Sequence, residues 1–293
     1  MNLPRFWLRN GWTRWHILAA VAMLGAGFAV TWEAWREMLS IGWRDEESNH
    51  VFLVPVIAVW LIWVRRDRFR QCCPRGTVAG PAFIAIGAIL SWIGYYYAIE
   101  SFWHAGSILI VVGCLLSVTG VDVLFRFLPA FIVLIFLVPV PGTVRMAVAV
   151  PLQGVLAQVT QFIFDIVGVD VARQGNLLSI NGQEVAIAEA CNGMRMVFTL
   201  MLVSIGVAFG TPLRNYVRLI IILASPLSAI LCNVIRMIPT VALYGYASQP
   251  IAKQFHDWAG WIMLFVAFLL LMGIIGALKW AVIPVRPYTL AYD

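Results

Sequence analysis

The sequence contains few charged residues. Only 12% of its 293 residues are Asp, Glu, Lys or Arg, whereas a soluble domain keeps about a quarter of its residues charged. Hydrophobic residues make up 62% of the chain, and they fall in blocks long enough to cross a hydrocarbon core of roughly 30 Å. These features exclude a soluble protein and predict an integral membrane protein embedded in a lipid bilayer.

Signals of several other protein classes are absent as well. The sequence has no glycine-rich nucleotide-binding loop, no internal repeat and no low-complexity tract. Its five cysteines have no metal-ligand spacing, and their odd number argues against a complete set of disulfides. The apolar segment 16–32 lacks a following small-residue cleavage site, so we expect no cleavable signal peptide. We expect one membrane domain over residues 1–293, with no cofactor, no bound metal and no nucleic-acid partner.

The apolar blocks predict an all-α polytopic fold with about eight transmembrane helices. The predicted spans are residues 16–32, 50–64, 79–98, 103–120, 122–140, 192–210, 216–239 and 256–278. With the N-terminus inside, most of the 20 basic residues fall in cytoplasmic segments, and most of the 14 acidic residues fall outside. Because Lys and Arg mark cytoplasmic loops, the net charge of +6 reflects topology, and both termini are predicted to be cytoplasmic.

Residues 144–169 are apolar enough to form a ninth span. However, Gln153, Gln158, Gln161 and Asp165 recur at helical spacing and form a polar stripe, which favours a helix lying in the outer interface. The alternative, a helix that crosses the bilayer, would place Arg214 and Arg218 outside.

A short β-hairpin is predicted after this helix. Two strand-like stretches, 177–180 and 184–188, flank Asn181-Gly182, a dipeptide suited to a type I′ turn. The hairpin leads directly into the segment that holds Cys191, at the start of the predicted sixth span.

Three chemically reactive side chains are predicted to lie at the same outer depth. Cys191 begins the sixth span, Arg236 lies near the outer end of the seventh, and His256 opens the eighth. Arg236 and His256 are placed on neighbouring helix ends, because the chain is expected to turn at Tyr244-Gly245-Tyr246 and Pro250. Ionisable residues in membrane spans are costly and mark functional sites by default.

These residue types suit nucleophilic catalysis. A helix N-terminus and a nearby cation, here Arg195 one turn further along, favour the thiolate of Cys191. His256 is suited to exchange a proton near neutral pH, and Arg236 to stabilise an oxyanion. Asn233, three residues before Arg236 on the same helix face, is placed to orient its guanidinium.

Simpler interpretations remain open at this point. Arg236 and His256 can serve as interfacial anchors, and Cys114 and Cys232 are typical packing residues. His50 and His104 lie at the outer ends of predicted spans, so they compete for the acid/base role and leave a weak metal site as an alternative. A transporter or channel that uses Arg236 and the outer histidines is the rival functional class.

The sequence resembles the exosortase/archaeosortase family of membrane-embedded cysteine proteases and transpeptidases. The likeness rests on Glu189-Ala190-Cys191-Asn192-Gly193-Met194-Arg195, on Asn233-Val234-Ile235-Arg236, and on Phe255-His256-Asp257 followed by Gly260. Asn49-His50 through Pro55 is a further similar segment. One departure is Asn192, where many members carry Ser.

This resemblance implies a site with Cys191 as nucleophile, His256 as general acid/base and Arg236 as oxyanion stabiliser. It adds Glu189, Asp257 and His50 to Arg195 and Asn233 as supporting residues. The implied substrates are exported proteins with a C-terminal sorting tail, made of a short motif, a transmembrane helix and a basic cluster. Cleavage, with transfer to an envelope acceptor, is expected at the outer face of the bacterial inner membrane.

Overall fold

The computed structural model describes residues 11–187 and 193–280, which form two compact units. In the described residues, unit 1 covers 11–141 and 205–212, and unit 2 covers 142–187, 193–204 and 213–280. Six described helical segments are long and apolar enough to cross a membrane, or seven if the bent pair α1 and α2 counts as one span. The predicted helical membrane fold is confirmed, while the count of eight spans and the single domain stay predictions.

Unit 1 begins with α1 (Arg14–Val30) and α2 (Trp32–Arg44), which meet at a bend of 74°. The segment η2 (Glu46–Phe52) leads into α3 (Leu53–Val64), and η3 (Arg66–Gln71) follows. The sequence did not predict α2, whose charged residues Glu33 and Arg36 lie on its exposed face while Ala34 and Met38 are buried. Its polar face explains why the first apolar span does not continue straight through it.

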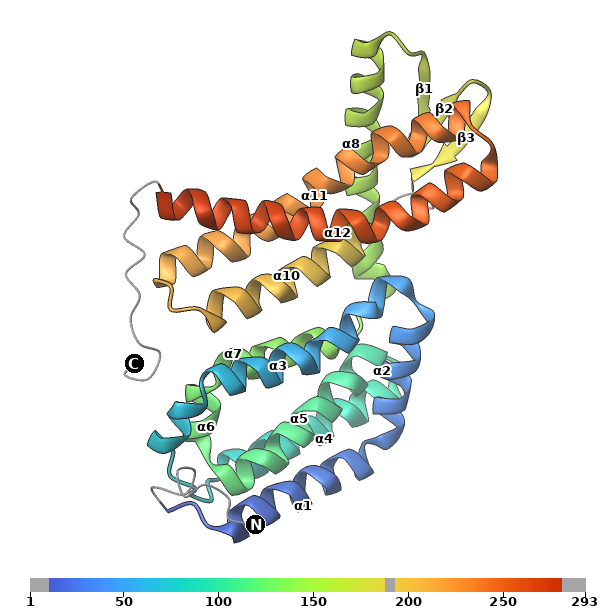
Figure 1. Cartoon of the computed structure of the whole chain (residues 1–293). Helices are drawn as coiled ribbons and strands as arrows, with labels where there is room; N and C mark the ends of the chain where they lie inside the picture. The colour runs from blue at the N-terminus through green and yellow to red at the C-terminus, as the bar shows by residue number, and fades with distance from the viewer. Residues whose placement is uncertain (1–10, 188–192, 281–293) are drawn as a thin grey trace. The chain divides into compact units, whose positions relative to one another are not determined.

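The closest helix pair of unit 1 is α4 (Ala79–Tyr96) and α5 (Glu100–Thr119), which run side by side (Figure 1). Glycines on both helices allow this approach. A Cβ added to Gly87 would lie 2.7 Å from the carbonyl oxygen of Gly106. Small residues drive helix association in membranes because they let two backbones come into van der Waals contact.

The predicted fifth span is broken into α6 (Val121–Arg126), α7 (Leu128–Val133) and η4 (Leu134–Leu137). The break lies at Phe127, because Pro129 in the first turn of α7 has no backbone N–H to bond the carbonyl of Phe125 and its ring clashes with that carbonyl in a continuous helix. The predicted single helix over residues 122–140 is therefore wrong in its continuity, although its apolar character is correct.

Unit 2 contains the long helix α8 (Gly142–Val167) and a three-stranded antiparallel sheet in the order β1-β2-β3. The strands are β1 (Val171–Gln174), β2 (Leu177–Ile180) and β3 (Gln183–Ala186). The predicted hairpin is confirmed, because β2 pairs with β3 and both turn residues have positive φ, 49° at Asn181 and 75° at Gly182. Strand β1 was not predicted, since Val-Ala-Arg-Gln shows no alternation of apolar and polar residues.

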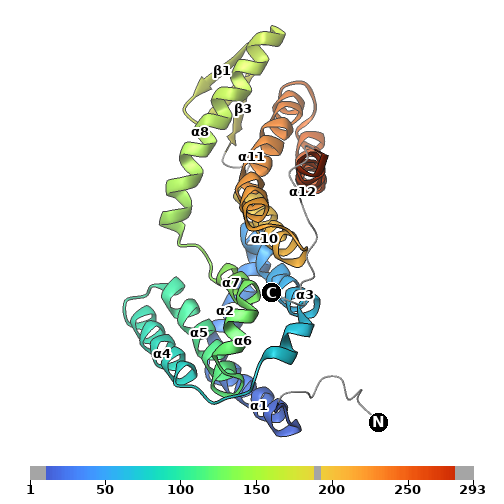
Figure 2. The ribbon, with the colours of Figure 1, turned by 90° about the vertical axis from the view of Figure 1, so that its left-hand side faces the viewer.

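The sheet packs between α8 and α11 (Asn215–Tyr246), and Figure 2 shows β1 beside α8. Leu156 of α8, Leu178 of β2 and Met237 of α11 belong to one buried core. Two residues of the polar stripe of α8 bind this sheet region: Gln161 donates to the carbonyl of Val171, and Gln153 accepts from the Asn176 side chain. The stripe thus has a packing role, and α8 also meets the length and composition test for a span, so its interfacial placement stays a prediction.

The remaining helices of unit 2 are α12 (Gln249–Trp280) and the first part of α10 (Gly193–Gly210), whose last residues belong to unit 1. Helices α11 and α12 pack against each other as an antiparallel pair (Figure 1). The predicted turn at Tyr244-Gly245-Tyr246 is wrong, because these residues are still helical and the chain turns at Ala247 and Ser248. Arg236 therefore lies about ten residues, or roughly 15 Å, before the end of α11.

Candidate active site

Arg236 is a buried arginine inside α11, with 3% of its surface exposed. Its Nη2 donates to Oδ1 of Asn233, 3.2 Å away and one turn earlier, and Asn233 is equally buried. The hydroxyl of Thr240 donates to the backbone carbonyl of Arg236 at 2.8 Å. The expected contact between Asn233 and Arg236 is present, and it fixes the guanidinium within the helix pair.

Arg236 and Arg195 converge on one glycine of α12. A Cβ added to Gly260 would lie 2.9 Å from Nη2 of Arg195 and 3.2 Å from Nη1 of Arg236. Arg195 comes from the first turn of α10 and Arg236 from the middle of α11. A larger residue here would have to displace the ends of both arginine side chains, so three helices meet at this position beside two cationic groups.

His256 lies one turn before Gly260 on α12, so the two residues share a face of the helix. Its side chain is half-buried, whereas that of Asp257 is exposed. Residues four apart in a helix have neighbouring side chains, so His256 borders the place where the two guanidinium groups meet. These residues lie inside the helix pair, not at helix ends as the sequence predicted.

Cys191, Glu189 and Asn192 lie outside the described residues. Cys191 precedes Gly193, the first described residue of α10, by two positions, and Arg195 follows by two more. The roles predicted for Cys191 and Glu189 therefore stay predictions. Arg195, the last residue of the motif at 189–195, is described, and its side chain lies beside Gly260.

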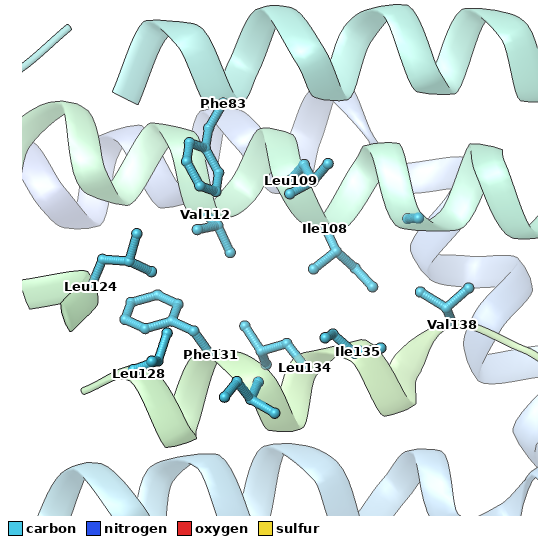
Figure 3. Close-up of a pocket in the computed structure, with 12 residues that line it drawn as sticks. Phe83, Ile108, Leu109, Val112, Leu124, Leu128, Phe131, Leu134, Ile135 and Val138 are labelled. Atoms are coloured by element: carbon cyan, nitrogen blue, oxygen red, sulfur yellow. The ribbon is translucent and has the colours of Figure 1, made fainter. Parts of the chain in front are cut away.

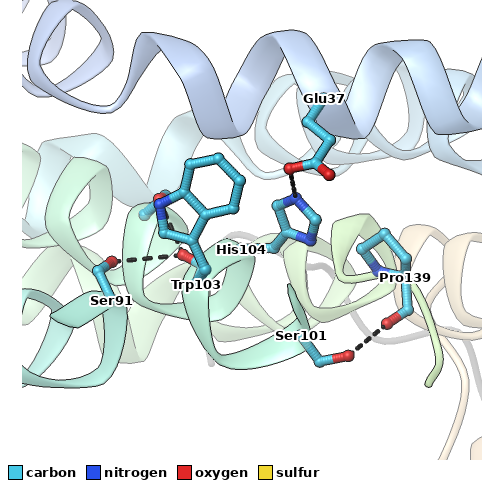
Figure 4. Close-up of polar contacts among 7 residues, drawn as sticks. Glu37, Ser91, Ser101, Trp103, His104 and Pro139 are labelled. Carbon is cyan, nitrogen blue, oxygen red and sulfur yellow. Dashed lines mark hydrogen bonds and ion pairs between the residues drawn. The ribbon is translucent and has the colours of Figure 1, made fainter. Parts of the chain in front are cut away.

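The two competing histidines belong to unit 1. His50 is buried in η2, and its Nδ1 lies 3.1 Å from the carbonyl oxygen of Glu47. His104 is completely buried in α5, and its Nε2 lies 3.3 Å from Oε2 of Glu37 in α2 (Figure 4). The ring of Trp103 stacks on His104 at a centroid distance of 5.4 Å. His104 thus links α5 to α2. The supporting role predicted for His50 stays a prediction.

The Glu37–His104 pair could not be predicted, because its partners are 67 residues apart in the sequence and Glu37 resembles an ordinary charged residue on an amphipathic helix. Thr240 was also missed. A threonine four residues after Arg236 is unremarkable in sequence, and only the structure shows that its hydroxyl donates to the carbonyl of Arg236.

The other cysteines have structural surroundings. Cys114 and Cys232 are buried in helices, as expected for packing residues. Cys72 directly follows η3 and is fully buried, and its Sγ lies 3.4 Å from the carbonyl oxygen of Arg68. Burial raises the pKa of the Cys72 thiol to about 11, which removes it as a nucleophile near neutral pH. Within residues 11–187 and 193–280, no group of three or more His, Cys, Asp or Glu side chains could hold a metal ion.

The fold and the site define a helical, multi-span membrane protein with a cationic site built from α10, α11 and α12. The family model for transmembrane exosortases (Exosortase_EpsH) matches residues 35–273, a range that includes Arg195, Arg236 and His256. The chain belongs to the transmembrane exosortase family. Comparison with curated proteins and with solved structures finds no match.

Proposed function

We propose that this exosortase is a cysteine peptidase and transpeptidase that removes the C-terminal sorting tail of exported proteins and transfers them to an envelope acceptor. Membership of the exosortase family supports a role in protein sorting at a membrane. The observation that carries the proposal is the convergence of Arg195 and Arg236 on Gly260, one helical turn from His256.

In the first step, the Cys191 thiolate attacks the carbonyl carbon of the scissile peptide bond. The oxygen becomes an oxyanion, and the guanidinium of Arg236, oriented by Asn233, stabilises it. His256 gives its proton to the leaving nitrogen, the C–N bond breaks, and a thioester on Cys191 remains.

In the second step, the acceptor amine, or water, attacks the thioester carbonyl. His256 takes the proton of the attacking group, and the C–S bond breaks to release the thiolate. Arg195 is a positioning residue here. A cation close to the first turn of α10 favours the thiolate over the thiol at Cys191.

The sheet and α8 are proposed to cover the site and limit the access of water. In support, Asn181 at the hairpin turn donates to the carbonyl of Gly245, and Gln249 donates to Gln183, so the hairpin is attached to the turn between α11 and α12. The distribution of basic residues supports an orientation with cytoplasmic termini and an outward-facing site in the inner membrane.

The proposal is tested with Cys191→Ala, expressed with a protein that carries a sorting tail. We expect full-length substrate to accumulate in the membrane, and a thioester to be trapped on wild-type Cys191 by a tail-motif peptide. Cys232→Ala, which alters a buried packing cysteine, is the matched control and should process the tail normally. Normal processing by Cys191→Ala would disprove the assignment and favour the transporter alternative.

A further inference from the structure

Unit 1 contains an apolar groove that the proposed chemistry does not use. It has a volume of about 380 Å³ and lies between α5 and the broken segment α6-α7-η4, with Phe83 of α4 at its side (Figure 3). Ile108 and Val112 of α5 face Phe131 and Leu134 across it. All twelve lining side chains are hydrocarbon, and the volume lies in the range of ligand pockets, roughly 300–1,000 Å³.

The groove results from the packing of these helices against different neighbours. Helix α5 packs against α4 and α1, whereas α7 and η4 pack mainly against α3. The apolar faces of α5 and α7 are left opposite each other with space between them, and Leu128, Ile132 and Ile135 form an exposed rim. An apolar gap of this size forfeits dispersion contacts unless hydrocarbon fills it, and the bilayer supplies hydrocarbon.

One end of the groove carries a basic cluster, defined here as Arg68, Arg75 and Arg126. Arg126 lies between the groove residues Leu124 and Leu128, and its backbone carbonyl accepts from Nη1 of Arg68 at 3.4 Å. The backbone of Arg75 lies against the start of α6, where a Cβ on Gly120 would be 2.7 Å from its carbonyl oxygen.

This cluster is held in place and is strongly cationic. Cys72, Val123 and Phe127 form a buried core beneath it, and the side chain of Gln71 binds Arg126. Residues 65–75 and 121–126 contain six arginines and only two aspartates, Asp67 and Asp122. The opposite end of the groove, near Val138, has no Lys or Arg in residues 97–103 or 134–141, and Glu100 lies there.

We propose that the groove and the basic cluster together bind one anionic phospholipid. An acyl chain occupies the groove, and the phosphate lies at Arg126 with Arg68 and Arg75. Charge complementarity selects this occupant, because an apolar groove with a basic end matches a lipid that carries an anionic head on a hydrocarbon chain. The opposite end has Glu100 and no Lys or Arg in residues 97–103 or 134–141, which disfavours the reverse orientation.

The test measures lipid binding to the full-length protein in detergent by native mass spectrometry. Phosphatidylglycerol and phosphatidylcholine with identical chains are titrated in separate samples. We expect the wild type to bind phosphatidylglycerol more tightly. Arg126→Gln should weaken phosphatidylglycerol binding about fivefold and leave phosphatidylcholine unchanged, whereas Arg126→Lys should keep the preference. Arg36→Gln, at an exposed ion pair on α2, is the control for charge and should bind as the wild type does.

The groove itself is tested with Ala105→Trp, which fills it from α5, and with Ile135→Trp at its rim. Both should weaken binding of both lipids. Ala88→Trp places the same side chain on the exposed surface of α4 and should leave binding unchanged. Equal affinity of the wild type for the two lipids, or equal effects of the tryptophans at 105 and 88, would overturn the proposal. The assay uses no sorting-tail substrate, so its result is independent of the proposed catalytic function.

Discussion

Arg236 and His104 are both buried ionisable side chains in helices long enough to span a membrane, and they differ in their surroundings. His104 contacts Glu37 from one neighbouring helix and is covered by the ring of Trp103. Arg236 is oriented by Asn233 and meets a second arginine over a glycine. A like-charged pair is costly at such a place, whereas a His–Glu pair is compatible with a structural link.

Burial of an ionisable group does not identify a functional site by itself. Arg236 differs from His104 because groups from separate helices meet beside a glycine, and variants of each place distinguish a catalytic from a structural role.

The largest effect is expected from Arg236→Ala. Loss of the proposed oxyanion donor should lower kcat for tail cleavage by about 100- to 1,000-fold, with little change in thermal stability relative to the activity loss. Rates are measured with a tail-motif peptide and purified enzyme. Arg218→Ala, at a half-buried arginine in the first turn of the same helix, should retain wild-type rates. Equal rates for the two variants would remove Arg236 from the mechanism.

A smaller loss is expected from Gly260→Ala. The added methyl group displaces the guanidinium groups of Arg195 and Arg236, and misplacement of a catalytic group by about 1 Å can cost up to roughly 100-fold in rate. We expect kcat to fall about 10- to 100-fold with the protein still folded. Gly273→Ala on the same helix meets open space and should be neutral. A fully active Gly260→Ala enzyme would show that the convergence has no function.

The smallest effect on activity is expected from Glu37→Ala. It leaves His104 buried without its carboxylate partner, which costs about 1–3 kcal/mol of stability. The unfolding temperature in detergent should fall while the specific activity of the folded fraction stays at the wild-type value. Glu33→Ala removes an exposed carboxylate from the same helix and should change neither quantity. A specific loss of activity in Glu37→Ala would move the Glu37–His104 pair from a structural role into the mechanism.

Much of the architecture could be read from the sequence because membrane helices and hairpin turns are encoded locally. The blocks at 79–98 and 103–120 correspond closely to α4 and α5, and Asn181-Gly182 identified its turn. The break before Pro129 was missed, because an apolar run looks the same whether its helix is straight or broken. Helix α2 was missed because it is amphipathic and does not form an apolar block.

The sequence predicted which residues belong to the candidate site, and the structure adds how the described ones among them are arranged. Arg236 and His256 stand out as ionisable residues in apolar helices, and Asn233 follows from the helical spacing. The sequence placed Arg236 and His256 at helix ends, whereas α11 and α12 extend beyond them to a turn that the hairpin contacts. The sequence also could not show that Gln153 and Gln161 of the α8 stripe bind the sheet region.

The sequence by itself determined that this protein is embedded in a bilayer, because apolar blocks of this length favour transfer from water into hydrocarbon whatever the tertiary structure. It also determined the hairpin turn and the residue types of the site. Only the tertiary structure decided that Arg195 and Arg236 meet at Gly260, and that α5 and α7 leave an apolar groove with a basic end. Both features depend on which helices pack together, and the spacing of residues along the chain does not reveal that packing.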